Sequence, residues 1–174
     1  YVEDVFSTHL YRGNNNYINV ANGVKLSNAN SGNSVYFVTN DNHFLITNHS
    51  NDFDFGSGDF TVEAWVRPNN ETQVDPGMVT LWNFPDGRRS WGIFGNTGGS
   101  SATYDGSVRA TVSPDGQWAT RTEITGTLTL NAWNHVAFIR NGNTLNFFID
   151  GVSQGTASYT GSVYNNTSDG VMIG

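Results

Sequence analysis

The sequence has little charge and no cysteine. Only 13% of its 174 residues are charged, Lys25 is the single lysine, and the formal net charge is −7. Without cysteine, the chain has no disulfide, thiol nucleophile or thiolate metal site. The only adjacent basic residues are Arg88 and Arg89, which excludes the clustered basic footprint of nucleic-acid binding. No apolar run is long enough to insert into a membrane.

Uncharged polar residues replace the missing charge. The chain holds 23 Asn, 20 Gly, 18 Thr and 15 Ser, together with eleven Phe, seven Tyr and five Trp. Abundant aromatics with low net charge exclude a disordered chain, and the surplus of turn formers and β-branched residues disfavours helices. The length fits one domain with a single core.

Short runs of Val, Ile, Thr and aromatic residues recur between clusters of Gly, Asn, Asp and Ser. This spacing is typical of an all-β sandwich or barrel. The expected strands are 5–10, 35–39, 44–47, 60–67, 78–83, 90–94, 108–112 and 125–130.

The clearest hairpin joins segments 133–140 and 145–149. Asn141-Gly142 lies between them and predicts a type I′ turn. In its second arm Leu145, Phe147 and Ile149 alternate with Asn146, Phe148 and Asp150, so one face is apolar.

Segment 60–67 alternates in the same way. Phe60, Val62, Ala64 and Val66 share one face, while Thr61, Glu63, Trp65 and Arg67 share the other. The first face is expected to pack inward. The second carries a tryptophan between a carboxylate and a guanidinium, as a partly covered sheet face would.

Two stretches resemble a known family. Residues 52–66, DFDFGSGDFTVEAWV, are similar to the opening motif of the laminin-G-like branch of the concanavalin A-like superfamily. WNHVA at 133–137 and LNFFIDG at 145–151 resemble that branch's hairpin, and VMIG at 171–174 resembles the strand that follows it. The resemblance covers 34–174 and implies a two-sheet antiparallel jelly roll.

The resemblance divides the chain into an N-terminal segment, 1–33, and a laminin-G-like domain, 34–174. The family's usual last strand, with the pattern F-x-G-x-I-D-x-V, is absent. Either the sequence stops early or the first 30 residues supply that strand, and both ends suggest a longer polypeptide. The stretch from Val5 to Leu26 is similar to structural proteins of tailed marine phages, which favours a virion component.

The sequence gives no reason to expect catalysis. Glycosidases of this superfamily carry an E-x-D-x-x-E arrangement, because retaining hydrolysis needs two acids about 5 Å apart. Glu63 is the only acid in its strand, and no nucleophile elbow occurs. The histidines show no zinc spacing: His43 and His49 are six residues apart.

Calcium is a more plausible cofactor for this sequence than zinc. Asp52, Asp54 and Asp59 crowd a single loop, and carboxylates on flexible loops suit this ion. Members of the laminin-G-like branch often hold calcium at a loop rim. The alternative is that Asp52 and Asp54 make local turn hydrogen bonds.

A glycan site would need an aromatic ring to stack on a sugar face. Trp65 and Trp133 match core positions of the family and are expected to be structural. The candidates are therefore in the middle third, where the resemblance is weakest: Trp82, Trp91, Tyr104 and Trp118, with Phe84 nearby. The alternative is that these rings fill the core or a protein interface.

These observations predict a non-catalytic adhesion or assembly module in an extracellular setting or a virion. In the first hypothesis its partners are protein neighbours in an assembly, including copies of itself as a homo-oligomer. In the alternative it is a secreted lectin-like module for cell-surface glycans, with or without calcium.

Overall fold

The computed structural model describes residues 19–20, 25–29, 32–37, 44–83, 86–99 and 102–174. These segments form a β-sandwich with one short 3₁₀ helix, η2 (Asn51–Phe53), and no α-helix. Within them, no helix is long and apolar enough to cross a bilayer. The expected strand at 5–10 and Phe84 lie outside the described residues.

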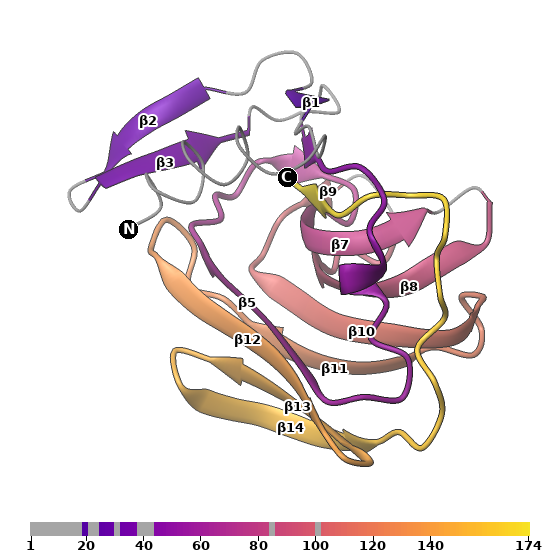
Figure 1. Ribbon diagram of the computed structural model, residues 1–174. Coiled ribbons are helices and arrows are strands. Elements are labelled where there is room, and N and C mark those ends of the chain that lie inside the picture. Colours follow the sequence, from indigo (N-terminus) through magenta and orange to yellow (C-terminus); the bar gives the residue numbers. More distant parts are fainter. Residues whose placement is uncertain (1–18, 21–24, 30–31, 38–43, 84–85, 100–101) are drawn as a thin grey trace.

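Two antiparallel sheets face each other (Figure 1). The seven-stranded sheet has the order β1-β4-β15-β7-β8-β10-β11, and the four-stranded sheet has the order β14-β13-β12-β5. The first comprises β1 (Asn19–Val20), β4 (Leu45–Ile46), β15 (Met172–Ile173), β7 (Gly77–Asn83), β8 (Arg88–Gly95), β10 (Ser107–Gly116) and β11 (Thr122–Thr127). The second comprises β14 (Val152–Ser158), β13 (Thr144–Ile149), β12 (Asn134–Asn141) and β5 (Phe60–Val66). This is the two-sheet jelly roll expected from the sequence.

Two further strand pairs complete the described structure. They are β2 (Lys25–Ala29) with β3 (Gly32–Tyr36), and β6 (Thr72–Gln73) with β9 (Ala102–Thr103). In the N-terminal segment, β1 pairs antiparallel with β4. The division of the chain at residues 33 and 34 stays a prediction.

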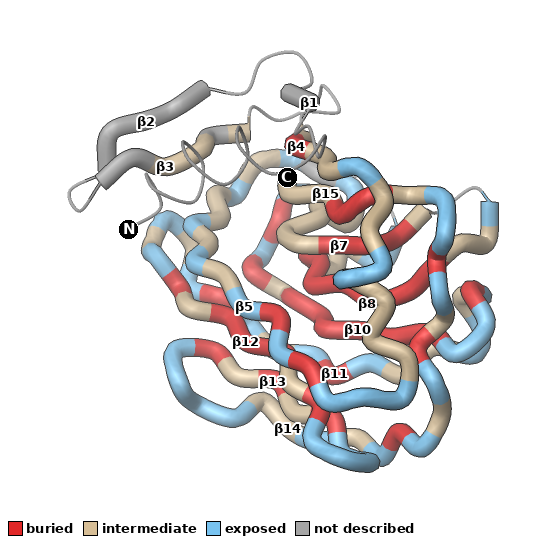
Figure 2. Tube along the Cα trace, viewed as in Figure 1, coloured by how far each residue is buried: buried red, intermediate tan, exposed pale blue. Residues whose placement is uncertain are grey.

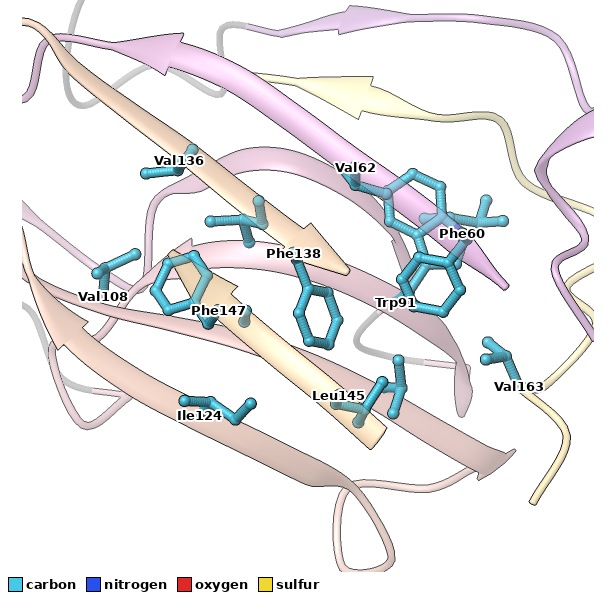
Figure 3. Close-up of a cluster of buried hydrophobic side chains, with 14 of the residues drawn as sticks. Phe60, Val62, Trp91, Val108, Ile124, Val136, Phe138, Leu145, Phe147 and Val163 are labelled. Carbon is cyan, nitrogen blue, oxygen red and sulfur yellow. The ribbon is translucent and has the colours of Figure 1, made fainter. Parts of the chain in front are cut away.

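The core lies between the two sheets, and buried residues of β8, β10 and β12 line it (Figure 2). Aromatic and branched side chains from both sheets meet there (Figure 3). The ring centroids of Phe60 and Phe138 are 5.6 Å apart, and those of Phe55 and Trp91 are 5.1 Å apart. Burying each such side chain contributes roughly 1.5–3 kcal/mol, so this interior is the main source of stability.

The turns at the two ends of β13 differ. In the β12–β13 turn, Asn141 pairs with Thr144, so Gly142 and Asn143 are the central residues, and only Gly142 has a positive φ, 57°. Positive φ at the first central residue is typical of a type II′ turn. The expected type I′ turn was therefore wrong in its type, and its central residues are shifted by one position from Asn141-Gly142. The β13–β14 turn has φ 50° at Asp150 and 76° at Gly151, as type I′ requires.

Strand β11 ends earlier than the sequence predicted, at Thr127 rather than near residue 130. The buried Asn134 side chain causes this difference. Its amide nitrogen donates to the carbonyls of Thr129 and Ala132, and its amide oxygen accepts from the Thr129 backbone N–H at 2.8 Å. These bonds replace a strand partner, and the chain turns through Asn131 at φ 59°.

Candidate binding site

Three of the four aromatic residues expected to bind a ligand are buried. Trp82 is 5% exposed, Trp91 2% and Tyr104 2%. The Trp91 indole packs between the sheets and donates to the Phe53 carbonyl at 3.1 Å, while the Tyr104 hydroxyl donates to the Ser107 carbonyl at 2.8 Å. Each ring thus has packing partners, and the last two also have a backbone acceptor. None of these three rings has an exposed face that could stack on a sugar, so their role in binding stays a prediction that their burial disfavours.

Trp118, the fourth candidate, is partly exposed and lies over the outer face of the seven-stranded sheet, the face turned away from the core. Its ring meets Trp82 edge-on at 6.3 Å. The guanidinium carbons of Arg121 and Arg109 lie 3.7 Å and 4.8 Å from its ring centroid. The Arg121 side chain also donates to the Trp118 carbonyl at 2.8 Å. Cations already occupy this ring, which leaves little of it for a sugar.

The Asp115 carboxylate shapes the loop that carries Trp118. It accepts from the Gln117 backbone N–H at 2.9 Å and from the hydroxyls of Thr120 and Ser113. The Thr120 hydroxyl, followed by the Gln117 N–H, holds the pKa of Asp115 below its ordinary value. The loop is therefore fixed by its own hydrogen bonds.

Arg109 is a buried cation beneath Trp118, with 5% of its surface exposed. Its two terminal nitrogens donate to the Asn96 amide oxygen at 2.9 Å and to the Asp75 carboxylate at 2.8 Å. Burial raises the pKa of Asp75, but hydrogen bonds from Arg109 and Thr97 outweigh burial and leave that pKa below its ordinary value. The pair is thus a structural link between β10 and the loop before β7.

The expected calcium ligands do not form a metal centre. Asp52 accepts from the Ser50 hydroxyl at 2.8 Å, and Asp59 accepts from the Gly142 backbone N–H at 2.7 Å. Asp54 ends the 3₁₀ helix. Among the described residues, no three His, Cys, Asp or Glu side chains gather where they could hold a metal ion. Asp52 thus makes a local hydrogen bond of the alternative kind, whereas Asp59 accepts from a residue distant in the sequence.

The most exposed tryptophans are the two expected in the core. Trp65 is 62% exposed and Trp133 is 42% exposed. Trp65 lies on β5, whose odd-numbered residues point away from the core while Phe60 and Val62 point inward. The strand alternation indicates an outward-facing Trp65, whereas the resemblance to the family implies a core position. The assignment of both residues to the core was wrong.

Trp65, His135 and Glu63 form a cluster on the outer face of the four-stranded sheet, which we call the Trp65 platform. The rings of Trp65 and His135 are 5.2 Å apart at 47°, and His135 Nε2 lies 3.4 Å from a Glu63 carboxylate oxygen. His135 is opposite Trp65 in the β5–β12 register, and Trp133 precedes it by two residues. The platform therefore rests on paired strands rather than on a loop.

The Asp150 turn holds β12 in place beneath the platform. The His135 backbone N–H donates to the Asp150 carboxylate at 2.7 Å, and the Asp150 backbone N–H donates to the His135 carbonyl at 2.8 Å. An exposed indole can stack on the C–H face of a sugar ring. The adjacent carboxylate and imidazole can accept from and donate to its hydroxyls. This combination suits non-covalent recognition of a carbohydrate.

The chain resembles several solved structures of binding domains. The binding domain of Paraclostridial Mosquitocidal Protein 1 aligns with a TM-score of 0.69 and 18% identity, covering 93% of this chain and 41% of that one. Domain 4 of the extracellular arabinanase AbnA from Geobacillus stearothermophilus, in complex with arabinotriose, aligns at 0.60 and 12% identity, covering 91% and 72%. The binding domain of Botulinum neurotoxin DC in complex with SialylT aligns at 0.57 and 15% identity, covering 92% and 39%. These identities show the fold alone, and the chain spans about two fifths of the length of the two toxin domains.

A search of curated proteins finds no match. The family model that matches is Laminin_G_3, described as the concanavalin A-like lectin/glucanases superfamily, over residues 38–174. That range includes both sheets apart from β1, so the match and the observed sandwich agree. The chain belongs to the concanavalin A-like lectin/glucanase superfamily, in its laminin-G-like branch.

Proposed function

We propose that this chain is a non-catalytic carbohydrate-binding module that acts outside the cell and binds its ligand at the Trp65 platform. The observation that carries the proposal is the 62% exposed Trp65 ring next to His135 and Glu63 on a paired strand. An exposed large ring on a regular sheet forgoes the favourable free energy of burying its apolar surface. A bound ligand would bury that surface and regain this free energy.

The solved relatives support this class of ligand. Two of them are complexes with a sugar, one of an arabinanase domain with arabinotriose and one of a toxin binding domain with SialylT. Both share the sandwich at low identity, so they support a carbohydrate as the ligand without identifying the sugar. Calcium has no part in the proposal, because the Asp52 and Asp59 carboxylates already accept hydrogen bonds within the protein.

The test is a printed glycan array followed by calorimetry on each glycan that binds, with arabinotriose and sialyllactose as defined probes. Trp65→Ala should weaken binding by about 30-fold, which corresponds to the roughly 2 kcal/mol of a binding hot spot. Val152→Ala is the control, since Val152 is 64% exposed on β14, at the opposite edge of the sheet from β5. Binding should persist in EDTA, and the oligosaccharide should be recovered uncleaved.

Three results would contradict the proposal: no glycan bound by the wild-type chain, equal binding by Trp65→Ala, or hydrolysis of the ligand. Loss of binding in EDTA would contradict the statement that calcium has no part in binding.

A second candidate is a structural component of a virion or another extracellular assembly. Trp65 and Trp133 favour it, because exposed tryptophans are also the usual anchors of protein interfaces. The phage-like stretch that suggested this role lies mostly outside the described residues. Mass spectrometry of purified particles from the source would find the chain in fixed proportion to the major particle protein. Its absence from the particles would exclude the role.

A further inference from the structure

Two further side chains, those of Arg67 and Trp133, lie next to the Trp65 platform. The last pair of the β5–β12 register is Val66 opposite Asn134. Arg67 follows Val66 and Trp133 precedes Asn134, so the antiparallel register places Arg67 and Trp133 opposite each other. This placement depends only on the pairing of β5 with β12, whatever lies along the other side of β5.

The backbone just beyond this pair keeps the two segments together. The Asn131 N–H donates to the Pro68 carbonyl at 2.7 Å, so Arg67 and Trp133 lie between two fixed backbone contacts. The Cβ atoms of opposed residues on antiparallel strands are about 4.5–5.5 Å apart. The two side chains are therefore neighbours that the backbone holds in place.

Both side chains point to the outer face of the four-stranded sheet. Val66 packs against the core and Asn134 is 1% exposed, so alternation directs the residues next to them the other way. Trp133 is 42% exposed, and Arg67 is exposed as well. The outer face thus carries a second pair of side chains directly after the Trp65–His135 pair.

The two exposed tryptophans lie on a diagonal of this block of four residues. Diagonal neighbours on antiparallel strands are about 7–8 Å apart, so the rings of Trp65 and Trp133 lie close enough to contact adjacent units of one sugar chain. A single terminal sugar would cover only one of the rings. The exposure of both therefore favours a ligand of at least two units.

Arg67 is the only arginine in the described part of the chain whose guanidinium has no acceptor there. The other five each donate to a carboxylate or to a backbone carbonyl: Arg88, Arg89, Arg109, Arg121 and Arg140. A guanidinium without an acceptor offers two parallel N–H donors that match the geometry of a carboxylate. Its position beside an exposed ring suits an acidic sugar.

Glu63 and Arg67 give the block opposite charges at its two ends. Each lies two residues from Trp65 on the same face, one before it and one after it. The Glu63 carboxylate accepts hydrogen bonds from hydroxyls and repels a second carboxylate. The net charge of −7 also opposes a ligand that is acidic along its whole length. An acidic group therefore fits at the Arg67 end and a neutral unit at the Glu63 end.

We propose that the ligand is an oligosaccharide whose neutral unit stacks on Trp65 and whose adjacent acidic unit stacks on Trp133, with its carboxylate on Arg67. This inference rests on the proposed function, because it specifies the ligand of the same site. The Trp65 ring then provides binding to glycans in general. Arg67 and Trp133 determine which glycans bind best.

The test compares each acidic glycan that binds on the array with its carboxyl-reduced counterpart, by calorimetry at neutral pH. Reduction of the carboxylate to a primary alcohol removes the charge and keeps the sugar ring. The wild-type chain should bind the acidic form about tenfold more tightly, as expected for a hydrogen-bonded charge pair. This preference should shrink as the salt concentration rises.

Two variants assign the preference to residues. Arg67→Gln should weaken binding of the acidic form by about tenfold and leave that of the carboxyl-reduced form unchanged. Trp133→Ala should weaken both forms by about tenfold, because it removes the second stacking ring. Arg121→Gln is the charge-matched control, since it removes the same charge over the opposite sheet, and it should change neither affinity. Unchanged circular dichroism would show that each variant folds.

Binding confined to neutral glycans, equal affinity for the two forms, or an Arg67→Gln effect that is the same on both would overturn the acidic unit. Unchanged binding by Trp133→Ala would overturn the second ring. Each of these results leaves the proposed function intact as long as Trp65→Ala weakens binding. A wild-type chain that binds no glycan would instead overturn the proposed function and this inference with it.

Discussion

Tryptophan shows how the neighbours of a residue decide its role in this molecule. Trp91 fills the space between the sheets, Trp118 lies beneath the Arg121 guanidinium, and Trp65 is open on the outer face of the four-stranded sheet. The side chain is the same in each case. What differs is the surroundings of the ring: Trp91 points into the core, Trp118 contacts a cation and Trp65 faces solvent.

Asp169 carries a charge that contributes to stability in acid. Its carboxylate accepts from Arg88 Nε at 2.8 Å, Asn166 Nδ2 at 2.9 Å and Asn83 Nδ2 at 3.1 Å. The Arg88 hydrogen bond, followed by those of Asn166 and Asn83, lowers the pKa of Asp169 to about 2. This network fastens the segment before β15 to the β7–β8 turn.

We therefore predict that the chain loses stability as the pH falls from about 4 to about 2. The folded pKa of Asp169 lies below its unfolded value, so the stabilisation is complete above the unfolded pKa and is lost as the carboxylate protonates. Urea unfolding at several pH values measures this loss. Asp169→Asn should be less stable at neutral pH by about 1–3 kcal/mol and should show a flatter acid profile.

Asp86→Asn is the control for this prediction. Asp86 also contacts Arg88, at 2.9 Å, but its side chain is half-exposed. Its removal should cost less than about 1 kcal/mol. An acid profile of Asp169→Asn equal to that of the wild type would show that the network does not set acid stability.

At the scale of strands and turns, alternation predicted the faces correctly. The inward faces of β5 and β13 are the expected ones, because apolar residues at every second position all lie on one face of a strand, and that face is buried. Strand β14 was missed because its sequence, VSQGTAS, has no apolar alternation, and it pairs through its backbone with β13. Trp65 shows that the local pattern predicted exposure better than the family position did.

Two glycines allow the cost of backbone strain to be distinguished from the cost of steric crowding. Gly116 ends β10 with φ 81°, and a Cβ there would lie within contact of the Gly87 carbonyl oxygen, closer than any real neighbour allows. Gly98 has φ 70° with nothing within 4 Å of a Cβ. We predict that Gly98→Ala costs about 1 kcal/mol and Gly116→Ala about 3 kcal/mol or more in the free energy of unfolding. Chemical denaturation measures both, and equal losses would mean that the β7–β8 turn moves aside.

The whole molecule is a sandwich whose two outer faces differ. Over the seven-stranded sheet, Trp118 packs edge-on against Trp82 and contacts two guanidinium groups. On the four-stranded sheet, Trp65 is exposed on β5. The sequence predicted the fold and the kind of side chain that would bind. It could not predict which face stays open, because that depends on a loop folding back over one sheet.

The central claim is that a glycan binds at the Trp65 platform, and the indole N–H signals of the five tryptophans test it most directly. A two-dimensional ¹⁵N–¹H spectrum, assigned with single Trp→Phe variants, would be recorded while adding a glycan that binds on the array. The account predicts that the Trp65 signal moves with increasing ligand, whereas those of Trp82 and Trp91 stay in place. Movement of the Trp118 and Trp82 signals with an unchanged Trp65 would contradict it.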